Sequence, residues 1–452
     1  MMKNVYDAIQ AIASTTKRKE KEAILEDIKA SSLNELFKRV AFLALDPRHN
    51  FNIVEYDQQE FLAEQSQDTC TLDEALDILE EKILNEGIRG NAAKDLLFDL
   101  SGKLVPEDQY VLKCIIDRTL RCGVSDKTIN KIWKDLIYIH PYRRCSSFSE
   151  KNIKNIKLPA LSQLKEDGMY VDIVVHDGKV EYRSRSGGFF PWHTEENDSL
   201  LKSNCEGSVL MGEALVKDEH GDIMDRQAGN GYLNGDDVDP TRIIFSLWDI
   251  IPYDEWVNGK SSQPYSKTYD RLLDTVPKLN YAFRIVDTRT VETVDDIVAH
   301  FKSNIAQGLE GSVVKNLDSV WKDGTSSDQV KVKLIFEVEL VVTDVYEGEK
   351  GRKYEGKLGG VTAKTSDGLL ISDVGSGFKD VEREKFFKNP SLIVGKVITV
   401  KACDISKSDD NEYFTLSNPR FIEIRHEKTE ADDFERVKEQ KQSSVESLNI
   451  IT

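Results

Sequence analysis

The spacing of apolar residues changes twice along this 452-residue chain, and each change limits what the segment can fold into. Up to about residue 145, apolar side chains recur at intervals of three and four, which is typical of helices with one buried face. From about Leu158 they alternate with polar residues, which predicts half-buried strands. After Leu334, short apolar runs separated by Gly-rich turns predict a second group of strands. A chain of this length should hold about two to four domains.

Capping residues predict where several of the N-terminal helices begin. Thr15 or Thr16 is expected to cap a helix through KRKEKEAILEDI, and Thr71 precedes the helical run LDEALDILEEKIL. Gly123 can end one helix, and Ser125 can cap the next. We therefore expect an all-α domain over residues 1–145.

The middle segment predicts strands and helices together. Apolar residues alternate from Met169 to Val175, and Asp177-Gly178 makes a tight turn, so a hairpin is expected. The run TRIIFSLWDII predicts a buried strand, and the residues from Thr293 to Gln307 predict a helix with one apolar face. We expect an α+β domain with antiparallel sheets over residues 146–334.

The final third predicts a small β-barrel. Its five expected strands are FEVELVVTDVYEG, GGVTAK, GLLISDVGSGF, GKVITVKACDI and YFTLSNPRFIEIR. Five short strands in about 95 residues suit an OB-fold barrel, here over residues 335–430. Residues 431–452 are charged, and we expect a helix followed by a loose tail.

The charge distribution restricts the partners. A net charge of -18 argues against a protein that coats nucleic acid nonspecifically. Residues 111–144, however, contain eight basic and three acidic residues, a net charge of +5, and include the predicted helix start at Ser125. Helix N-termini bind phosphate, so this segment is expected to contact a phosphate backbone. Because the chain contains neither an apolar run of about 18 residues nor a signal core, we expect a cytoplasmic protein without a membrane partner.

An ordered set of charged residues points to chemistry on a nucleotide phosphate. Lys165 opens the run KEDG after an apolar stretch, and Glu213, Glu310, Lys331 and Lys333 follow it. A lysine nucleophile has to lose its proton, and neighbouring cations lower its pKa. Lysines also stabilise charge on phosphate oxygens, and two carboxylates with phosphate oxygens can bind magnesium.

Each of these residues also has a simpler interpretation. A lysine in a turn is often only exposed, and a glutamate beside a glycine is often a solvated strand end. Trp248 lies in an apolar strand and is either a core residue or a platform for a purine ring. Arg425 and Lys428, late in the last expected strand, would by default be a surface pair.

The motifs together resemble those of the covalent nucleotidyltransferases, and within them the ATP-dependent DNA ligases of the kind found in T-even-type bacteriophages. QLKEDG resembles the adenylation motif, and SRSG, MGEALV, SLWD, EGSVVKN and KVK resemble the later motifs in the same order. TTKRKEKEAILE, RGNAA, RCGVS, INKIW, RQAGNG, VGSGFK and PRFIEIRHEK resemble parts outside the active site, so the likeness covers nearly the whole chain.

The resemblance implies that ATP adenylates Lys165, that AMP then passes to the 5'-phosphate of nicked duplex DNA, and that the 3'-hydroxyl displaces AMP to seal the strand. It implies catalytic roles for Lys165, Lys331 and Lys333 and magnesium binding by Glu213 and Glu310. The implied nucleotide contacts are Leu164, Lys165, Glu213, Trp248, Lys331, Lys333, Arg425 and Lys428, of which the last two would orient pyrophosphate in the first step only. The implied DNA contacts are Arg185, which would bind the 5'-phosphate of the nick, and Arg121, Gly123, Ser125 and Lys127.

Three positions depart from the family pattern. Tyr170 stands where relatives carry arginine, Met211 where an aspartate commonly precedes Gly212, and Glu427 where the last motif has aspartate. An RNA ligase, a capping-type nucleotidyltransferase and an inactive DNA-binding relative are the alternatives.

The chain end and the assembly are the remaining expectations. Gln442, Val445 and Leu448 are spaced loosely like a sliding-clamp peptide without its aromatic pair, so a clamp contact is only weakly predicted and a frayed tail is favoured. We expect a monomer, in the host cytoplasm if the protein is viral.

Overall fold

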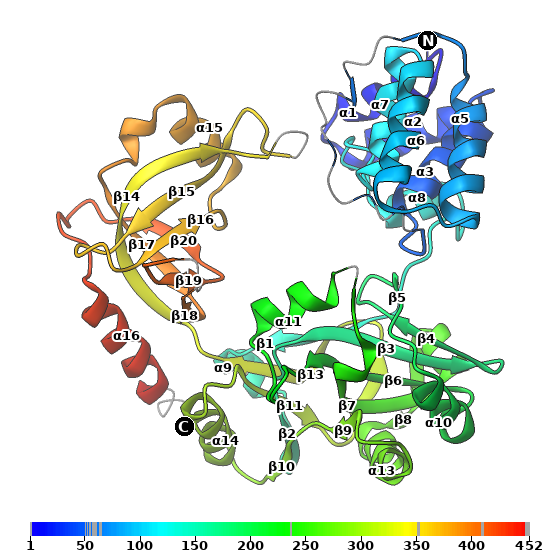
Figure 1. Ribbon diagram of the computed structural model, residues 1–452. Helices are drawn as coiled ribbons and strands as arrows, with labels where there is room; N and C mark the ends of the chain where they lie inside the picture. The colour runs from blue at the N-terminus through cyan, green and yellow to red at the C-terminus, as the bar shows by residue number, and fades with distance from the viewer. Residues whose placement is uncertain are drawn as a thin grey trace. The chain divides into compact units, whose positions relative to one another are not determined.

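The computed structural model describes residues 2–49, 51, 53, 56, 61–62, 66–235, 237–349, 353–407 and 411–447. The chain divides into two compact units (Figure 1). We name Met1–His140 with Arg183–Phe190 the helical unit, and Pro141–Tyr182 with Pro191–Thr452 the β unit. No helix in the described ranges is long and apolar enough to cross a membrane.

The helical unit consists of short amphipathic helices around one apolar core. They are α1 (Val5–Ala13), α2 (Arg18–Lys29), α3 (Asn34–Leu45), α5 (Leu72–Leu79), a π-helical turn (Glu80–Asn85), α6 (Gly90–Lys103), α7 (Pro106–Ile116) and α8 (Asp126–Ile132). Thr71 forms the expected capping box with Glu74, and the Ser125 side chain caps α8. The expected cap of α2 is wrong: α2 begins after Lys17, whose backbone N–H donates to the Thr15 hydroxyl at 3.2 Å.

The first sheet of the β unit has the order β1-β13-β11-β2-β10. Its strands are β1 (Arg143–Ser147), β13 (Gly324–Lys333), β11 (Gly311–Asn316), β2 (Ala160–Leu164) and β10 (Thr288–Val291). Helix α14 (Val294–Ala306) lies within the predicted range, is capped by Thr293, and packs on β11, β2 and β10 (Figure 1). One face of this sheet is therefore covered by α14.

A second sheet contains the strands β4-β3-β6-β7-β9 in that order. These are β4 (Lys179–Arg183), β3 (Met169–His176), β6 (Ser208–Val216), β7 (Ile243–Pro252) and β9 (Phe283–Ile285). The predicted hairpin turn is present, with φ of 50° at Asp177 and 67° at Gly178. Most strand pairs are antiparallel as expected, but β1 pairs with β13, and β7 with β9, in parallel.

Smaller elements surround the two sheets. Helices α10 (Glu195–Cys205) and α13 (Tyr265–Thr275) pack on β3 and β7, and α11 (Arg226–Leu233) packs on β6. The short elements are α9 (Glu150–Ile153), α12 (Tyr253–Val257), β8 (Lys260–Pro264) and β12 (Val320–Lys322), with β5 (Phe189–Phe190) in the helical unit.

The C-terminal part of the β unit has a curved sheet with the order β16-β15-β14-β17-β20 and a hairpin of β18 and β19. The strands are β14 (Phe336–Glu347), β15 (Leu358–Lys364), β16 (Ile371–Val374), β17 (Val397–Ala402), β18 (Asp404–Ser406), β19 (Thr415–Ser417) and β20 (Arg420–Ile424). Two predicted strands are thus each broken in two, and the sequence reading missed helix α15 (Asp380–Lys388). Helix α16 (Phe434–Ser447) packs against β14. We name Phe336–Ser447 the C-terminal β region.

Candidate functional site

Lys165 lies directly after the end of β2, an interior strand of the first sheet between β11 and β10. Its backbone N–H donates to Gly311 O at 3.0 Å, which extends the pairing of β2 with β11. Its Nζ forms an ion pair with the Glu310 carboxylate, and the two side chains are 25% and 19% exposed. The amine is therefore held by a carboxylate yet open to a ligand.

Gly311 allows β11 and β13 to approach closely beside Lys165. Its φ is +144°, and a Cβ at this position would lie 2.3 Å from Val332 O. Gly311 pairs with Lys333, and Val313 pairs with Lys331. Because paired residues on neighbouring strands share a face, Lys165, Lys331 and Lys333 lie on the same face of the sheet.

Helix α14 supports the opposite face of the sheet. Asn304 donates from Nδ2 to Gly311 O at 3.0 Å and to Ser312 Oγ at 3.1 Å, and His300 Nδ1 lies 2.8 Å from Ser162 Oγ. Burial lowers the pKa of His300, which favours the neutral ring. Leu164 alternates with Lys165, so its side chain lies on this supported face and only its backbone borders the lysine face.

Glu213 lies opposite Lys165 on the second sheet, paired with Tyr170 on β3 and with Ser246 on β7. Burial raises its pKa to about 8, the Lys165 ammonium opposes this rise, and the Glu310 and Glu166 carboxylates add to it. The cluster therefore contains one lysine within electrostatic reach of three carboxylates. The simpler interpretation of Glu213 as a solvated strand-end residue does not hold, since it lies inside β6.

Residues around the KEDG run hold its backbone in place. Glu166 accepts hydrogen bonds from Ser246 Oγ at 2.7 Å and from Arg284 at 2.9 Å. Asp167 forms an ion pair of 3.0 Å with Arg226, the first residue of α11. Both carboxylates are thus used to position the segment that carries Lys165.

Trp248 stands at an irregularity of β7, where the register with β6 shifts between Met211 and Gly212. Its ring centroid lies 5.9 Å from that of Tyr170, whose hydroxyl donates to Asp172 at 2.7 Å. Tyr142 meets Tyr170 edge-on at 4.7 Å. Tyr170 thus belongs to an aromatic cluster.

Lys315 joins the two sheets beside this aromatic cluster and was missed by the sequence reading. Its Nζ lies 5.5 Å from the Trp248 ring centroid and 4.7 Å from that of Tyr265. Burial lowers its pKa to about 8, and the nearby Asp249 carboxylate opposes the shift. A lysine inside the apolar strand SVVKN was the available signal.

Arg425 and Lys428 lie beyond β20 and not within the last strand as expected. Each forms an ion pair with a different carboxylate oxygen of Glu339 on β14. Arg425 also pairs with Glu427 at 2.7 Å. The structure therefore places these two cations at Glu339.

The predicted DNA contacts lie in the helical unit. Arg185 is exposed in a turn closed by the Gly187 N–H, which donates to Ser184 O at 2.9 Å. Gly123 has a φ of +64°, and the buried Lys21 donates to its carbonyl at 3.1 Å, which anchors the loop before α8. Lys127 is exposed in the first turn of α8.

Several cations of the net positive segment over residues 111–144 face carboxylates or carbonyls of the helical unit. Lys113 and Arg121 both pair with Asp117, and Arg118 donates to the carbonyls of Leu43 and Asp46. These cations stabilise the helical core, so the phosphate-binding potential of the segment rests on fewer residues than its net charge indicates.

The carboxylates of the cluster fit only a small metal-ligand set. Within the described ranges, no group of three or more His, Cys, Asp or Glu side chains could hold a metal ion. Magnesium needs only one or two protein carboxylates when phosphate oxygens complete its shell. Glu213 and Glu310 are compatible with that smaller requirement.

Comparisons with known proteins agree with this geometry. The family described as ATP dependent DNA ligase domain matches residues 143–333. The DNA ligase of Enterobacteria phage T4 is 28% identical over 490 residues, covering 97% of this chain and 98% of that protein. The DNA ligase of Thermococcus onnurineus is 26% identical over 317 residues, covering 62% of this chain and 54% of that protein.

The fold has a match along most of the chain. The solved structure titled Pmar-Lig_PreS3 superposes with a TM-score of 0.74 at 24% identity, covering 93% of this chain and 99% of that one. Together with the lysine-centred cluster, the family match over residues 143–333 and the similarity to the phage enzymes along nearly the whole chain show that this chain resembles the ATP-dependent DNA ligases.

Proposed function

We propose that this chain seals nicks in duplex DNA with Lys165 Nζ as the nucleophile of the first step. The neutral amine attacks the α-phosphorus of ATP, a P–N bond forms, the bond to the bridging oxygen breaks, and pyrophosphate leaves with the electron pair. The observation that carries this proposal is the position of Lys165, ion-paired to Glu310, on one sheet face with Lys331 and Lys333.

The roles of the neighbouring residues follow from the charge that develops on the phosphate. Lys331 and Lys333 would stabilise the α-phosphate oxygens, because preorganised cations near a developing negative charge lower the barrier. Trp248 would stack on the adenine, with Tyr170 at its edge. Glu213 would meet the ribose, and below about pH 8 its protonated carboxyl can donate a hydrogen bond as well as accept one.

Glu310 is the better candidate ligand for a magnesium ion. Glu213 keeps its proton to about pH 8, whereas Glu310 is ion-paired with Lys165. A bound ion would supply positive charge to the phosphate oxygens. Glu310 would exchange its contact with the amine for the ion and so leave Lys165 available to attack.

The later steps require DNA at the same lysine. AMP passes from Lys165 to the 5'-phosphate of the nick, and the 3'-hydroxyl then displaces AMP and forms the phosphodiester bond. The exposed Arg185 would bind the 5'-phosphate, and the start of α8 at Ser125 and Lys127 would hold the duplex backbone. Gly123 would let the backbone approach the duplex, whereas Arg121 would act mainly by shaping this loop, since it pairs with Asp117.

The domain assignment that fits these roles has a helical DNA-binding domain over 1–145, an adenylation domain over 146–334 and an OB-fold over 335–430, followed by the tail. Arg425 and Lys428, on the OB-fold, would bind the leaving pyrophosphate. Two of the three residues of the clamp-like spacing, Gln442 and Val445, lie in α16, while Leu448 lies outside the described residues. The clamp contact therefore stays a weak prediction.

An adenylation assay tests the nucleophile. Incubation with α-labelled ATP and magnesium should place acid-labile AMP on the wild-type chain and on Lys179→Ala, a matched exposed lysine on β4. Lys165→Ala should carry no label. Label retained on Lys165→Ala would refute the nucleophile, and an unlabelled wild type would favour an inactive relative.

A sealing assay tests the substrate class. The enzyme should join nicked duplex DNA and leave single-stranded RNA ends unjoined. Efficient joining of single-stranded RNA with no joining of nicked DNA would favour the RNA ligase alternative.

A further inference from the structure

Glu339 is a buried carboxylate that binds two cations at once. Its side chain is only 9% exposed, one of its oxygens binds Arg425, and the other binds Lys428. The Arg425 and Lys428 side chains are 27% and 43% exposed. The carboxylate is thus hidden while both cationic groups can still meet a ligand.

The backbone around Glu339 holds the segment that carries these cations. The Glu339 N–H donates to the Asp432 carboxylate at 2.7 Å, and the Asp432 N–H donates to Glu339 O at 2.8 Å. The Arg425 N–H donates to Val397 O at 2.8 Å on the neighbouring strand. The backbone of the turn from Arg425 to Asp432 is therefore tied to β17 at its start and to β14 at its end.

The strand that carries Glu339 continues directly from the strand that carries the catalytic lysines. Strand β13 ends at Lys333 and β14 begins at Phe336. A rotation at Leu334 and Ile335 would move Glu339 together with its two cations. The conformation of Leu334 and Ile335 therefore helps to set the position of both cations.

Without the Glu339 carboxylate between them, the positive charges of Arg425 and Lys428 would repel each other. Glu339 in turn needs both cations, because a buried carboxylate without partners is strongly unfavourable. Arg425 keeps its contact with Glu427 on other nitrogens, and Lys428 uses only one of its three N–H groups on Glu339. The remaining donors can bind an anion while the contacts with Glu339 persist. With Glu427, which pairs with Arg425, these four side chains carry a net charge of 0, so an anion would be bound through the remaining N–H donors rather than through excess positive charge.

We propose that Glu339 is a positioning residue for the first step, in which it holds Arg425 and Lys428 side by side to receive the leaving pyrophosphate. This inference rests on the proposed role of the two cations in pyrophosphate binding. Glu339 itself touches no reacting atom. Its removal should therefore impair adenylation by ATP and spare the sealing of DNA that is already adenylated.

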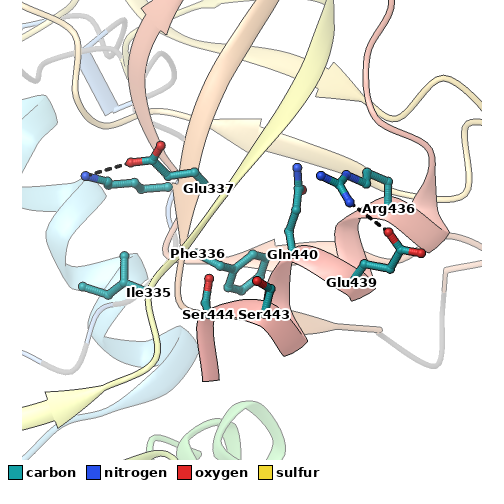
Figure 2. Close-up of a pocket in the computed structure, with 9 residues that line it drawn as sticks. Ile335, Phe336, Glu337, Arg436, Glu439, Gln440, Ser443 and Ser444 are labelled. Carbon is teal, nitrogen blue, oxygen red and sulfur yellow. Dashed lines mark hydrogen bonds and ion pairs between the residues drawn. The ribbon is translucent and has the colours of Figure 1, made fainter. Parts of the chain in front are cut away.

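Glu337 offers a matched control on the same strand. It lies two residues before Glu339, on the same face of β14, and pairs with Lys401 at 3.0 Å. Figure 2 shows this ion pair at the rim of a cavity of about 500 Å³ between β14 and α16. Glu337→Gln thus removes a charge from the same strand without touching Arg425 or Lys428.

The test compares two single-turnover rates in the full chain, enzyme–AMP formation from ATP and sealing of a pre-adenylated nick. Glu339→Gln should lower kcat/KM for enzyme–AMP formation by about tenfold or more, the usual effect of losing a charge-assisted contact, and leave sealing within about twofold. Glu337→Gln should leave both rates within about twofold. Glu339→Asp, which keeps the charge but reaches less far, should recover part of the first-step loss.

The outcomes separate the inference from the function on which it rests. If Arg425→Ala and Lys428→Ala slow the first step but Glu339→Gln does not, the positioning role is overturned. If neither cation variant slows it, the pyrophosphate role is overturned and the inference with it. Equal losses in both steps for Glu339→Gln and Glu339→Asp would assign Glu339 to folding alone and also overturn the proposal.

Discussion

Replacing Gly311 by alanine should disrupt the strand ends that hold Lys165, although the substitution adds only one methyl group. The new Cβ would lie 2.3 Å from Val332 O and 3.2 Å from Lys333 Cα. Non-bonded carbon and oxygen atoms stay more than about 3 Å apart, so β11 and β13 would have to separate by about 1 Å. Gly311 O would move too, and it accepts the hydrogen bond from the Lys165 N–H.

The expected cost has two parts. A φ of +144° at a residue with a Cβ costs about 1–3 kcal/mol. Overpacking against a strand costs about 1–3 kcal/mol more. Gly308→Ala is the matched control, because Gly308 also has a positive φ, +77°, but its Cβ would meet no atom within 4 Å. The control should lose only about 1–2 kcal/mol from its backbone conformation.

Urea unfolding followed by tryptophan fluorescence measures the difference, because Trp192, Trp248, Trp256 and Trp321 all lie in the β unit. Gly311→Ala should lose about 2 kcal/mol more than Gly308→Ala and form enzyme–AMP at least about tenfold more slowly. Equal stability losses in the two variants would show that the close contact of β11 with β13 does not constrain these strand ends.

Three further predictions test other parts of the molecule. Folding raises the pKa of Glu213 from 4.5 to about 8, so between these pH values the folded state holds a proton that the unfolded state has lost. The free energy of unfolding therefore falls as pH rises, by up to about 1.4 kcal/mol per pH unit. Glu213→Gln should therefore gain stability relative to wild type between pH 5 and pH 8 in urea unfolding, and a pH-independent difference would contradict the burial of this carboxyl. Asn304→Ala removes the amide that donates to Gly311 O and should cost about 1–3 kcal/mol in the same assay, whereas no loss would mean that this carbonyl needs no support from α14. Ser125→Ala removes the hydroxyl that accepts from the Thr128 N–H, and it should lower the free energy of unfolding by about 1 kcal/mol and weaken binding to nicked DNA. An unchanged affinity for nicked DNA would contradict a DNA contact at the start of α8.

Local patterns in the sequence predicted many elements because their causes are local. The Asp177-Gly178 turn, the helix that begins after Thr71 and the helix predicted over Thr293–Gln307 each depend on a few adjacent residues. The cap of α2 was mispredicted because Thr15 and Thr16 both satisfy the rule, and the chain instead begins the helix after Lys17. Helix α15 was missed because its charged residues obscure the apolar period.

The candidate site could also be predicted only in part, because motif order is a local property and the contacts of each side chain are not. The order of charged motifs was sufficient to single out Lys165, Glu213, Glu310, Lys331 and Lys333, and the structure places all of them in the β unit. Their roles remain proposals. The charge count over residues 111–144 was misleading, because a sum of charges does not show which cations face inward to partners such as Asp117.

The helical and strand-rich segments, the lysine motif and the resemblance to ATP-dependent DNA ligases could be predicted from the chain alone, because periodicity and motif order are properties of neighbouring residues. Which distant residues meet depends on the packing of the folded chain. The raised pKa of Glu213, the position of Lys315 over Trp248 and the binding of Arg425 and Lys428 by Glu339 each require strands far apart in sequence to pack together. Burial and electrostatic coupling depend on distance in space, which a linear pattern does not contain.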